Sequence, residues 1–197
     1  YLLGSYALDV GLSALGRLDP VRLAGHILEN LCEDIQETVA LAVWGNRGAT
    51  IVRIFDSGAP ITITLRAGTV LPLCKSATGQ AFAAFFRSPF LKQMLDQELR
   101  EISEGSKIAI TAARRQLEKT LTEIRRHGIS RASGSLTPGI NGFSAPVFDH
   151  SGMMVAAITS LGAVGEFSVE WDSPVAKAML AAAGDLSRKL GFNRPQR

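Results

Sequence analysis

The chain has 197 residues and a mass of 21.0 kDa, a length typical of one large domain or two small ones. Hydrophobic residues make up 46% of it and charged residues 20%, which excludes disordered and fibrous proteins and is slightly apolar for a monomer. The net charge of +3 is spread along the chain, so no basic stripe predicts that these residues alone bind nucleic acid.

Membrane spans, disulfide frameworks and metal centres are not predicted. The longest apolar run without a charge, residues 151–165, is shorter than the roughly 20 residues that span a bilayer. The N-terminus lacks the basic segment and cleavage-site pattern of a signal peptide. Cys32 and Cys74 show no metal-ligand spacing, and no histidine stands four residues from another. We therefore expect a cytoplasmic protein without metal, cofactor or membrane contact.

Two helices are predicted before the first strand. Residues 1–18 carry apolar side chains at helical spacing on more than one flank, which is typical of a helix covered on several sides. Asp19 is a typical N-cap residue and Pro20 a typical first-turn residue. Because apolar residues then recur at steps of four from Leu23 to Ile35, the sequence predicts a second helix there.

The pattern changes to strands from residue 38 onward. Segments 38–43, 50–55 and 60–66 are rich in Val, Ile, Thr and Phe, and turn-forming residues separate them. They predict three strands of an antiparallel meander. Residues 76–79, followed by an apolar run that begins near Phe82, predict a loop that feeds a helix N-terminus.

Helices fill the middle of the chain and close it. Two are predicted over residues 89–99 and 111–127, and Gly128 is typical of the residue that ends a helix. A last helix begins with Ser173 as N-cap and ends at Gly191.

Strand patterns return in segments 140–148 and 153–161. The turn-rich residues 149–152 join them, as in a β-hairpin. Strands in two groups, with helices between them and at both ends, predict an α+β sandwich in which helices pack on one antiparallel sheet. No linker or repeat divides the chain, so we expect one domain over residues 1–197.

No enzyme signature is present at the required spacing. Phosphate-binding glycine loops, zinc-protease histidines, calcium loops and nucleophile elbows are all missing from the sequence. Cys74 is the strongest nucleophile candidate, because a nearby helix N-terminus and Lys75 would lower its pKa. The alternative is that Cys74 and Cys32 are inert core thiols. A small thiol or redox enzyme acting on a metabolite therefore stays open as a hypothesis.

A binding pocket is better supported than an active site. Ser76, Ala77, Thr78 and Gly79 place small side chains where the free N–H groups of a helix emerge, and such a terminus attracts an anion. The alternative is that Ser76 or Thr78 only caps the helix. The hydroxyl of Thr159 either faces a cavity or bonds to nearby backbone.

Six segments follow one another in an order and spacing that coincidence does not explain. Arg125–Ile129 is similar to a pattern I-R-x-x-G-Y, and Ala145–Gly152 to a pattern A-P-V-F-D-x-x-G. The other four are Tyr1–Tyr6, Glu37–Ala42, Gly68–Ala81 and Pro138–Ile140. In this order they resemble the C-terminal effector-binding domain of the IclR family of bacterial transcriptional regulators over essentially the whole chain.

The resemblance implies a GAF-like fold with a small-molecule pocket over one sheet face. It also implies homodimers, often assembled into tetramers, and a winged helix-turn-helix domain before the effector-binding domain. Tyr1 falls where that effector-binding domain begins, with a linker helix over about residues 1–18. We therefore expect promoter DNA to be contacted only through a domain that this sequence lacks.

The resemblance also implies effector contacts, residue by residue. They fall on Leu73, Ala77, Thr78, Ala132, Ile140, Gly142, Thr159 and Leu161, and the helix N-terminus pattern adds Ser76. Relatives that bind small 2-oxo acids carry an acid at the position of Ala132 and polar or thiol groups at those of Gly142 and Leu161. Apolar walls here, with space beside Gly142, predict an aromatic or branched aliphatic carboxylate instead.

The leading hypothesis is therefore a ligand sensor without a catalytic role. A small organic effector would bind the domain and modulate DNA binding by the regulator. The thiol enzyme acting through Cys74 or Cys32, and a dimerisation module without ligand, stay as alternatives.

Overall fold

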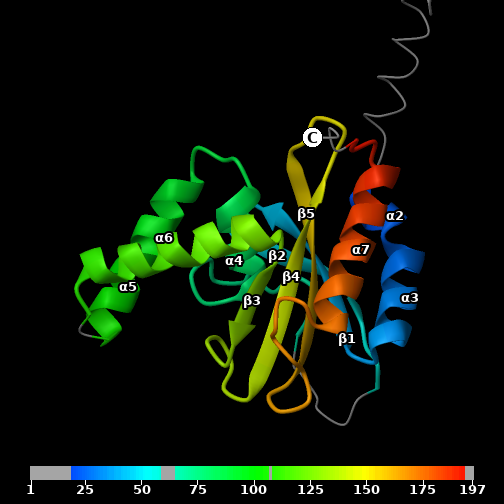
Figure 1. Cartoon of the computed structure of the whole chain (residues 1–197). Coiled ribbons are helices and arrows are strands. Elements are labelled where there is room, and N and C mark those ends of the chain that lie inside the picture. The colour runs from blue at the N-terminus through cyan, green and yellow to red at the C-terminus, as the bar shows by residue number, and fades with distance from the viewer. Residues whose placement is uncertain (1–18, 59–64, 107, 194–197) are drawn as a thin grey trace, which may run out of the picture.

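A computed structural model describes residues 19–58, 65–106 and 108–193 (Figure 1). Its centre is a five-stranded sheet in the order β2-β1-β5-β4-β3, and every pair of neighbours is antiparallel. The strands are β1 (Thr38–Gly45), β2 (Gly48–Phe55), β3 (Ser130–Ser133), β4 (Ile140–Phe148) and β5 (Met154–Ala163). This sheet, with helices packed on it, confirms the predicted α+β architecture.

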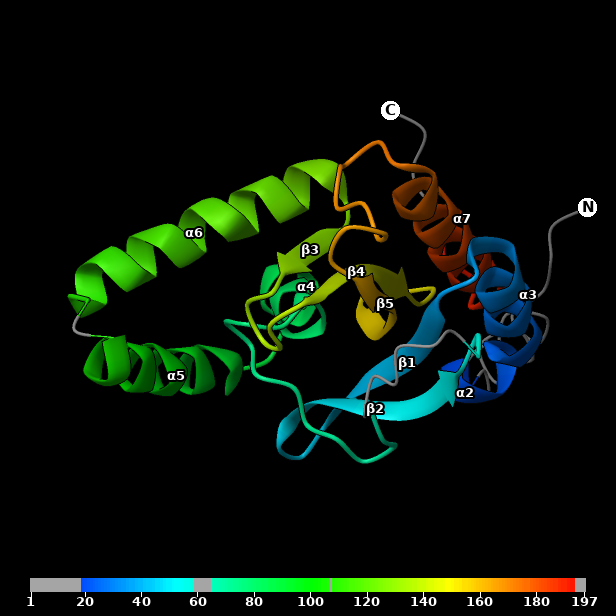
Figure 2. The ribbon, with the colours of Figure 1, turned by 90° about the horizontal axis from the view of Figure 1, so that it is seen from below.

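Helices cover both faces of the sheet. They are α2 (Pro20–Leu23), α3 (Gly25–Ile35), α4 (Ala77–Phe85), α5 (Leu91–Ser106), α6 (Ile110–His127) and α7 (Pro174–Lys189). Figures 1 and 2 show α3 and α7 side by side on one face and α4 on the other. Beyond α4, the antiparallel pair α5 and α6 projects away from the sheet; we call this pair the arm.

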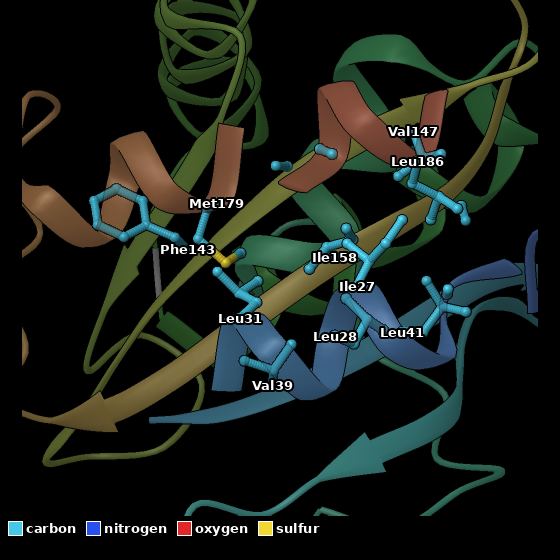
Figure 3. Close-up of a cluster of buried hydrophobic side chains, with 14 of the residues drawn as sticks. Ile27, Leu28, Leu31, Val39, Leu41, Phe143, Val147, Ile158, Met179 and Leu186 are labelled. Atoms are coloured by element: carbon cyan, nitrogen blue, oxygen red, sulfur yellow. The ribbon is translucent and has the colours of Figure 1, made fainter. Parts of the chain in front are cut away.

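The core under α3 and α7 follows the two-residue period of the strands. Alternate residues such as Phe143 on β4 and Ile158 on β5 point to this face. They pack against apolar residues of the two helices, among them Leu28 and Met179, all fully buried (Figure 3). This face of the sheet is therefore filled mainly by apolar side chains.

The opposite face carries a different core and leaves room for a site. Phe82 of α4 is fully buried there, with Trp44 and Phe86 packed around its ring. A third cluster joins α4 to the arm through Leu99 and Leu121. Beside these clusters, part of the same sheet face, at β3, β4 and β5, is covered by loops and not by apolar helix residues.

Local capping explains where several helices begin and end. Asp19 accepts the N–H of Val21 at 2.8 Å, and Ser173 accepts that of Ala176 at 3.2 Å. Gly128 ends α6 in the left-handed conformation, with φ of 74°. These caps confirm the predicted helix boundaries at residues 19–20, 128 and 173–174.

The structure corrects some element boundaries. The helix predicted over residues 20–35 is interrupted at Ala24, and the helix predicted over 89–99 begins at Leu91 and continues to Ser106. Asp96 pairs with Arg114 of α6 at 2.8 Å and Leu99 packs against α6, so the longer helix lies along its partner in the arm. Of the predicted strand 60–66, Leu65 and Arg66 lie outside any strand; the rest, like the helix 1–18, falls outside the described residues.

Candidate functional site

A cavity of about 480 Å³ lies on the α4 face of the sheet. Its floor is formed by β3, β4 and β5, and the N-terminus of α4 forms one end. Segments 65–72 and 135–138 supply the side walls. A volume of this size is typical of a site for a small organic molecule.

The first turn of α4 opens onto the cavity with unpaired donors. Ser76 is the N-cap, and its hydroxyl accepts the N–H of Gly79 at 2.8 Å. The N–H groups of Ala77 and Thr78 have no carbonyl within the helix to bond, and within the described part of the chain no other acceptor bonds to them. Both residues line the cavity, so an anion there would meet two free donors and the positive end of the helix dipole.

Three hydroxyl groups are linked beneath this helix terminus. Thr159 Oγ1 lies 2.8 Å from Thr78 Oγ1 and 2.9 Å from Ser144 Oγ, and all three residues are buried. Ser130 of β3 donates to the carbonyl oxygen of Ala77. The start of α4 is thus hydrogen-bonded directly to β3 and β5, and through Thr159 to β4, which fixes the position of its N–H groups.

Gly142 does not enlarge the cavity as predicted. It faces Leu161 across β4 and β5, and a β-carbon at Gly142 would stand 2.7 Å from Leu161 Cδ2. The Leu161 side chain therefore occupies the space above this glycine. The pair forms a smooth apolar part of the floor instead of an extra recess.

The structure brings eight of the nine predicted contact residues to this one cavity. They are Ser76, Ala77, Thr78, Ala132, Ile140, Gly142, Thr159 and Leu161. Leu73 is the exception, because its side chain is 1% exposed and packs in the core around Phe82. Whether the eight touch an effector stays a prediction.

Most residues of the cavity's side walls were not predicted from the sequence. Thr69, Val70 and Pro72 come from an irregular segment, and Leu136 and Thr137 come from the β3–β4 loop. Neither segment has a hydrophobic period that would place it over the sheet. The signal that was available is their position next to Gly68–Ala81 and Pro138–Ile140, two of the segments on which the family resemblance rests.

No charged side chain lines the cavity among the described residues. Its polar groups are hydroxyls and backbone groups, and the side-chain amide of Asn141 donates to the carbonyl oxygen of Phe167 at 2.8 Å. An anionic ligand would therefore be held by neutral donors, and the rest of the wall would contact apolar atoms.

The prediction that the pKa of Cys74 is lowered was wrong. Burial raises the pKa of this thiol to about 12, and the negative charge of Glu98 acts in the same direction. Burial also raises the pKa of Cys32, whose sulfur lies 3.3 Å from the carbonyl oxygen of Glu37. Neither thiol is activated for nucleophilic chemistry.

Within residues 19–58, 65–106 and 108–193, no group of three or more His, Cys, Asp and Glu residues could hold a metal ion. No helix there has the length and apolar character needed to cross a membrane.

Known proteins resemble the chain over nearly its full length. The model of the bacterial transcriptional regulator IclR C-terminal family matches residues 12–188. The HTH-type transcriptional regulator RhmR of Escherichia coli is 27% identical over 182 residues, which is 92% of this chain and 69% of RhmR. The HTH-type transcriptional regulator KipR of Bacillus subtilis is 24% identical over 193 residues, or 98% of this chain and 76% of KipR.

Solved structures agree with these sequence matches. HmgR of Pseudomonas aeruginosa superposes with a TM-score of 0.85 at 36% identity, covering 98% of this chain and 75% of HmgR. IclR of Thermotoga maritima superposes with a TM-score of 0.75 at 25% identity, covering 98% of this chain and 76% of that protein. The chain belongs to the IclR family of bacterial transcriptional regulators, as an effector-binding domain and not as an enzyme.

Proposed function

We propose that the cavity binds an effector with a hydrophobic body and one carboxylate end, and that this binding modulates the DNA binding of the regulator. The observation that carries the proposal is the pair of unpaired N–H groups at Ala77 and Thr78, set at the end of a cavity that no charged side chain of the described residues lines. A carboxylate fits these donors. An aromatic or branched aliphatic group fits walls such as Ile140 and Leu161.

Regulation follows if the effector prefers one arrangement of the domain over another. Only such differential affinity can shift an equilibrium and move attached DNA-binding domains. We place promoter contact in a winged helix-turn-helix domain on the N-terminal side, joined through residues 1–18. The relatives RhmR and KipR are both named HTH-type regulators, which supports this arrangement.

Thermal unfolding with a panel of acids tests the ligand class. Phenylacetate and 3-methylbutanoate should raise Tm, whereas pyruvate and glyoxylate should not. A ligand at about 100 times its Kd adds about 2.7 kcal/mol to the native state. In a domain of this length that raises Tm by about 5–10 °C. Stabilisation by pyruvate or glyoxylate alone would contradict the proposed class.

The variant Ala77→Phe tests the location. Ala77 lines the cavity at the helix terminus, so a phenyl group there should fill the place of the carboxylate and remove the Tm shift. Ala112→Phe is the matched control, because Ala112 is an exposed residue of α6. Thr159→Val, which keeps the side-chain shape but removes the hydroxyl, should reduce the shift without filling the cavity. An unchanged shift in Ala77→Phe would show that the ligand binds elsewhere.

We further propose that the domain forms a dimer or tetramer. The apolar flanks of residues 1–18 are more than one core can cover, and apolar patches of this kind mark interfaces. Light scattering coupled to size exclusion at micromolar concentration should report at least a dimer. A single species of 21 kDa would contradict this prediction.

A further inference from the structure

Glu98 of α5 reaches from the arm to the backbone of the cavity wall. Its Oε1 accepts the N–H of Leu73 at 2.8 Å, and its Oε2 accepts the N–H of Cys74 at 2.9 Å. Each carboxylate oxygen therefore accepts a hydrogen bond from one of two consecutive backbone N–H groups. Hydrogen bonds to an ionised acceptor are the stronger kind, and they are directional.

The segment that Glu98 holds is the one that connects the cavity wall to α4. Leu71, Pro72 and Ser76 line the cavity on either side of the two residues bonded to Glu98. We call residues 71–76 the hinge segment. Its backbone position decides where the wall and the N-terminus of α4 stand relative to each other.

Two further hydrogen bonds fix the hinge segment, one within it and one from α4. Ser76 Oγ donates to the Pro72 carbonyl oxygen at 2.7 Å, and Gln80 Nε2 donates to that of Cys74 at 2.9 Å. The β3–β4 loop joins in, because Ser135 Oγ donates to the carbonyl oxygen of Lys75 at 2.8 Å. Glu98 is thus the contact from the arm in a ring of hydrogen bonds around this segment.

We propose that Glu98 is a positioning residue for the cavity: its carboxylate holds the hinge segment in the form that receives the effector, and it couples the arm to ligand binding. The coupling half of this inference rests on the proposed function. In the arm, α6 contacts α4, whereas α5 makes its main helix contact with α6. Leu91 of α5 also packs in the core around Phe82. The two bonds of Glu98 add a polar link from α5 to the cavity wall.

Reciprocity gives the inference a measurable consequence. If an ordered hinge segment favours both the effector and the present position of α5, each must stabilise the other by the same free energy. Effector binding should then slow hydrogen exchange in the hinge segment and also in α5, which does not line the cavity.

The variant Glu98→Gln is the direct test, with Glu101→Gln as its matched control one turn further along α5. Glutamine keeps the length of the side chain but turns one acceptor into a donor that faces an N–H group. Glu101 is exposed, and its carboxylate accepts from Gln97 of the same helix. We expect about 10- to 100-fold weaker phenylacetate binding in Glu98→Gln, the effect of losing one charged hydrogen bond, and unchanged binding in Glu101→Gln.

Two measurements on the protein without ligand separate this inference from the proposed effector class. In Glu98→Gln, backbone hydrogen exchange of residues 71–76 should become faster, and iodoacetamide should alkylate Cys74 faster at pH 8. Peptide mapping by mass spectrometry distinguishes Cys74 from Cys32. Exchange and alkylation equal to those of the wild type would overturn the positioning role, whether or not phenylacetate binds.

The last part of the experiment uses the wild-type protein. Phenylacetate should slow exchange in residues 71–76 and in α5 together. Slower exchange in the hinge segment alone would overturn the coupling to the arm and leave the proposed function intact. Absence of any slowing would instead contradict the proposed effector class, and Glu98 would then be judged on the variants without ligand.

Discussion

Replacing Gly79 by alanine should lower the free energy of unfolding by about 3 kcal/mol, in the upper range of overpacking effects. A β-carbon at Gly79 would stand 2.1 Å from the carbonyl oxygen of Pro72 and 2.5 Å from Leu73 Cα. Both atoms belong to the backbone of the hinge segment, so no side-chain rotation can relieve the contact. The first turn of α4 can approach this segment only with glycine at position 79.

Urea unfolding followed by circular dichroism measures this effect, and the chain offers a matched control. Gly105 lies in α5 with nothing within 4 Å of its β-carbon position. Gly105→Ala should therefore leave stability unchanged or raise it by up to about 1 kcal/mol through helix propensity. Equal stability of the two variants would show that α4 does not press against the hinge segment.

Replacing Phe82 by alanine should lower the free energy of unfolding by about 3–5 kcal/mol. Phe82 has no exposed surface, and its ring centroid lies 5.6 Å from that of Trp44 and 5.7 Å from that of Phe86. The loss combines the transfer free energy of the ring with the void left between α4 and the sheet. Because total stability of a domain is about 5–15 kcal/mol, this is a large fraction of it.

Phe90→Ala is the control for this second prediction. Phe90 is 66% exposed and belongs to the turn before α5. Its removal should change stability by no more than about 0.5 kcal/mol, as is usual for surface positions. A loss in Phe90→Ala as large as that in Phe82→Ala would mean that the second core cluster is placed wrongly.

The parts of the fold that were predicted correctly are those with a local cause. The Asp19 and Ser173 caps act on N–H groups two or three residues away, so they can be read from adjacent residues. The hairpin of β4 and β5 follows likewise from the turn-rich residues between two apolar segments. Periodicity and capping need no knowledge of the rest of the fold.

The parts that were missed depend on distant partners. Strand β3 has only four residues, and its pairing with β4 defines it more than its composition does. For Cys74, the neighbour Lys75 and the helix N-terminus suggested a lowered pKa, but Glu98 comes from a helix 24 residues later in the chain. Burial and that carboxylate decide the pKa, and neither can be read from nearby residues.

In the candidate site, too, some features could be predicted from the sequence and others depend on distant partners. The residues of the α4 terminus and of β4 and β5 were placed by family resemblance, because the order of the six resembling segments along the chain implies their positions in the fold. The space at Gly142 was misjudged, since the register that brings Leu161 across from it is a property of the assembled sheet. At Gly142 the small side chain therefore indicates the close approach of Leu161 and not open space.

Methyl NMR shows directly whether the effector binds between the sheet and the N-terminus of α4. Phenylacetate should shift the methyl signals of Leu71, Ile140 and Leu161, which line the cavity. The methyl signals of Leu28 and Ile158, which are buried on the opposite face of the sheet, should not shift (Figure 3). Shifts confined to Leu28 and Ile158, or no shift in either set with any acid of the panel, would contradict binding in this cavity.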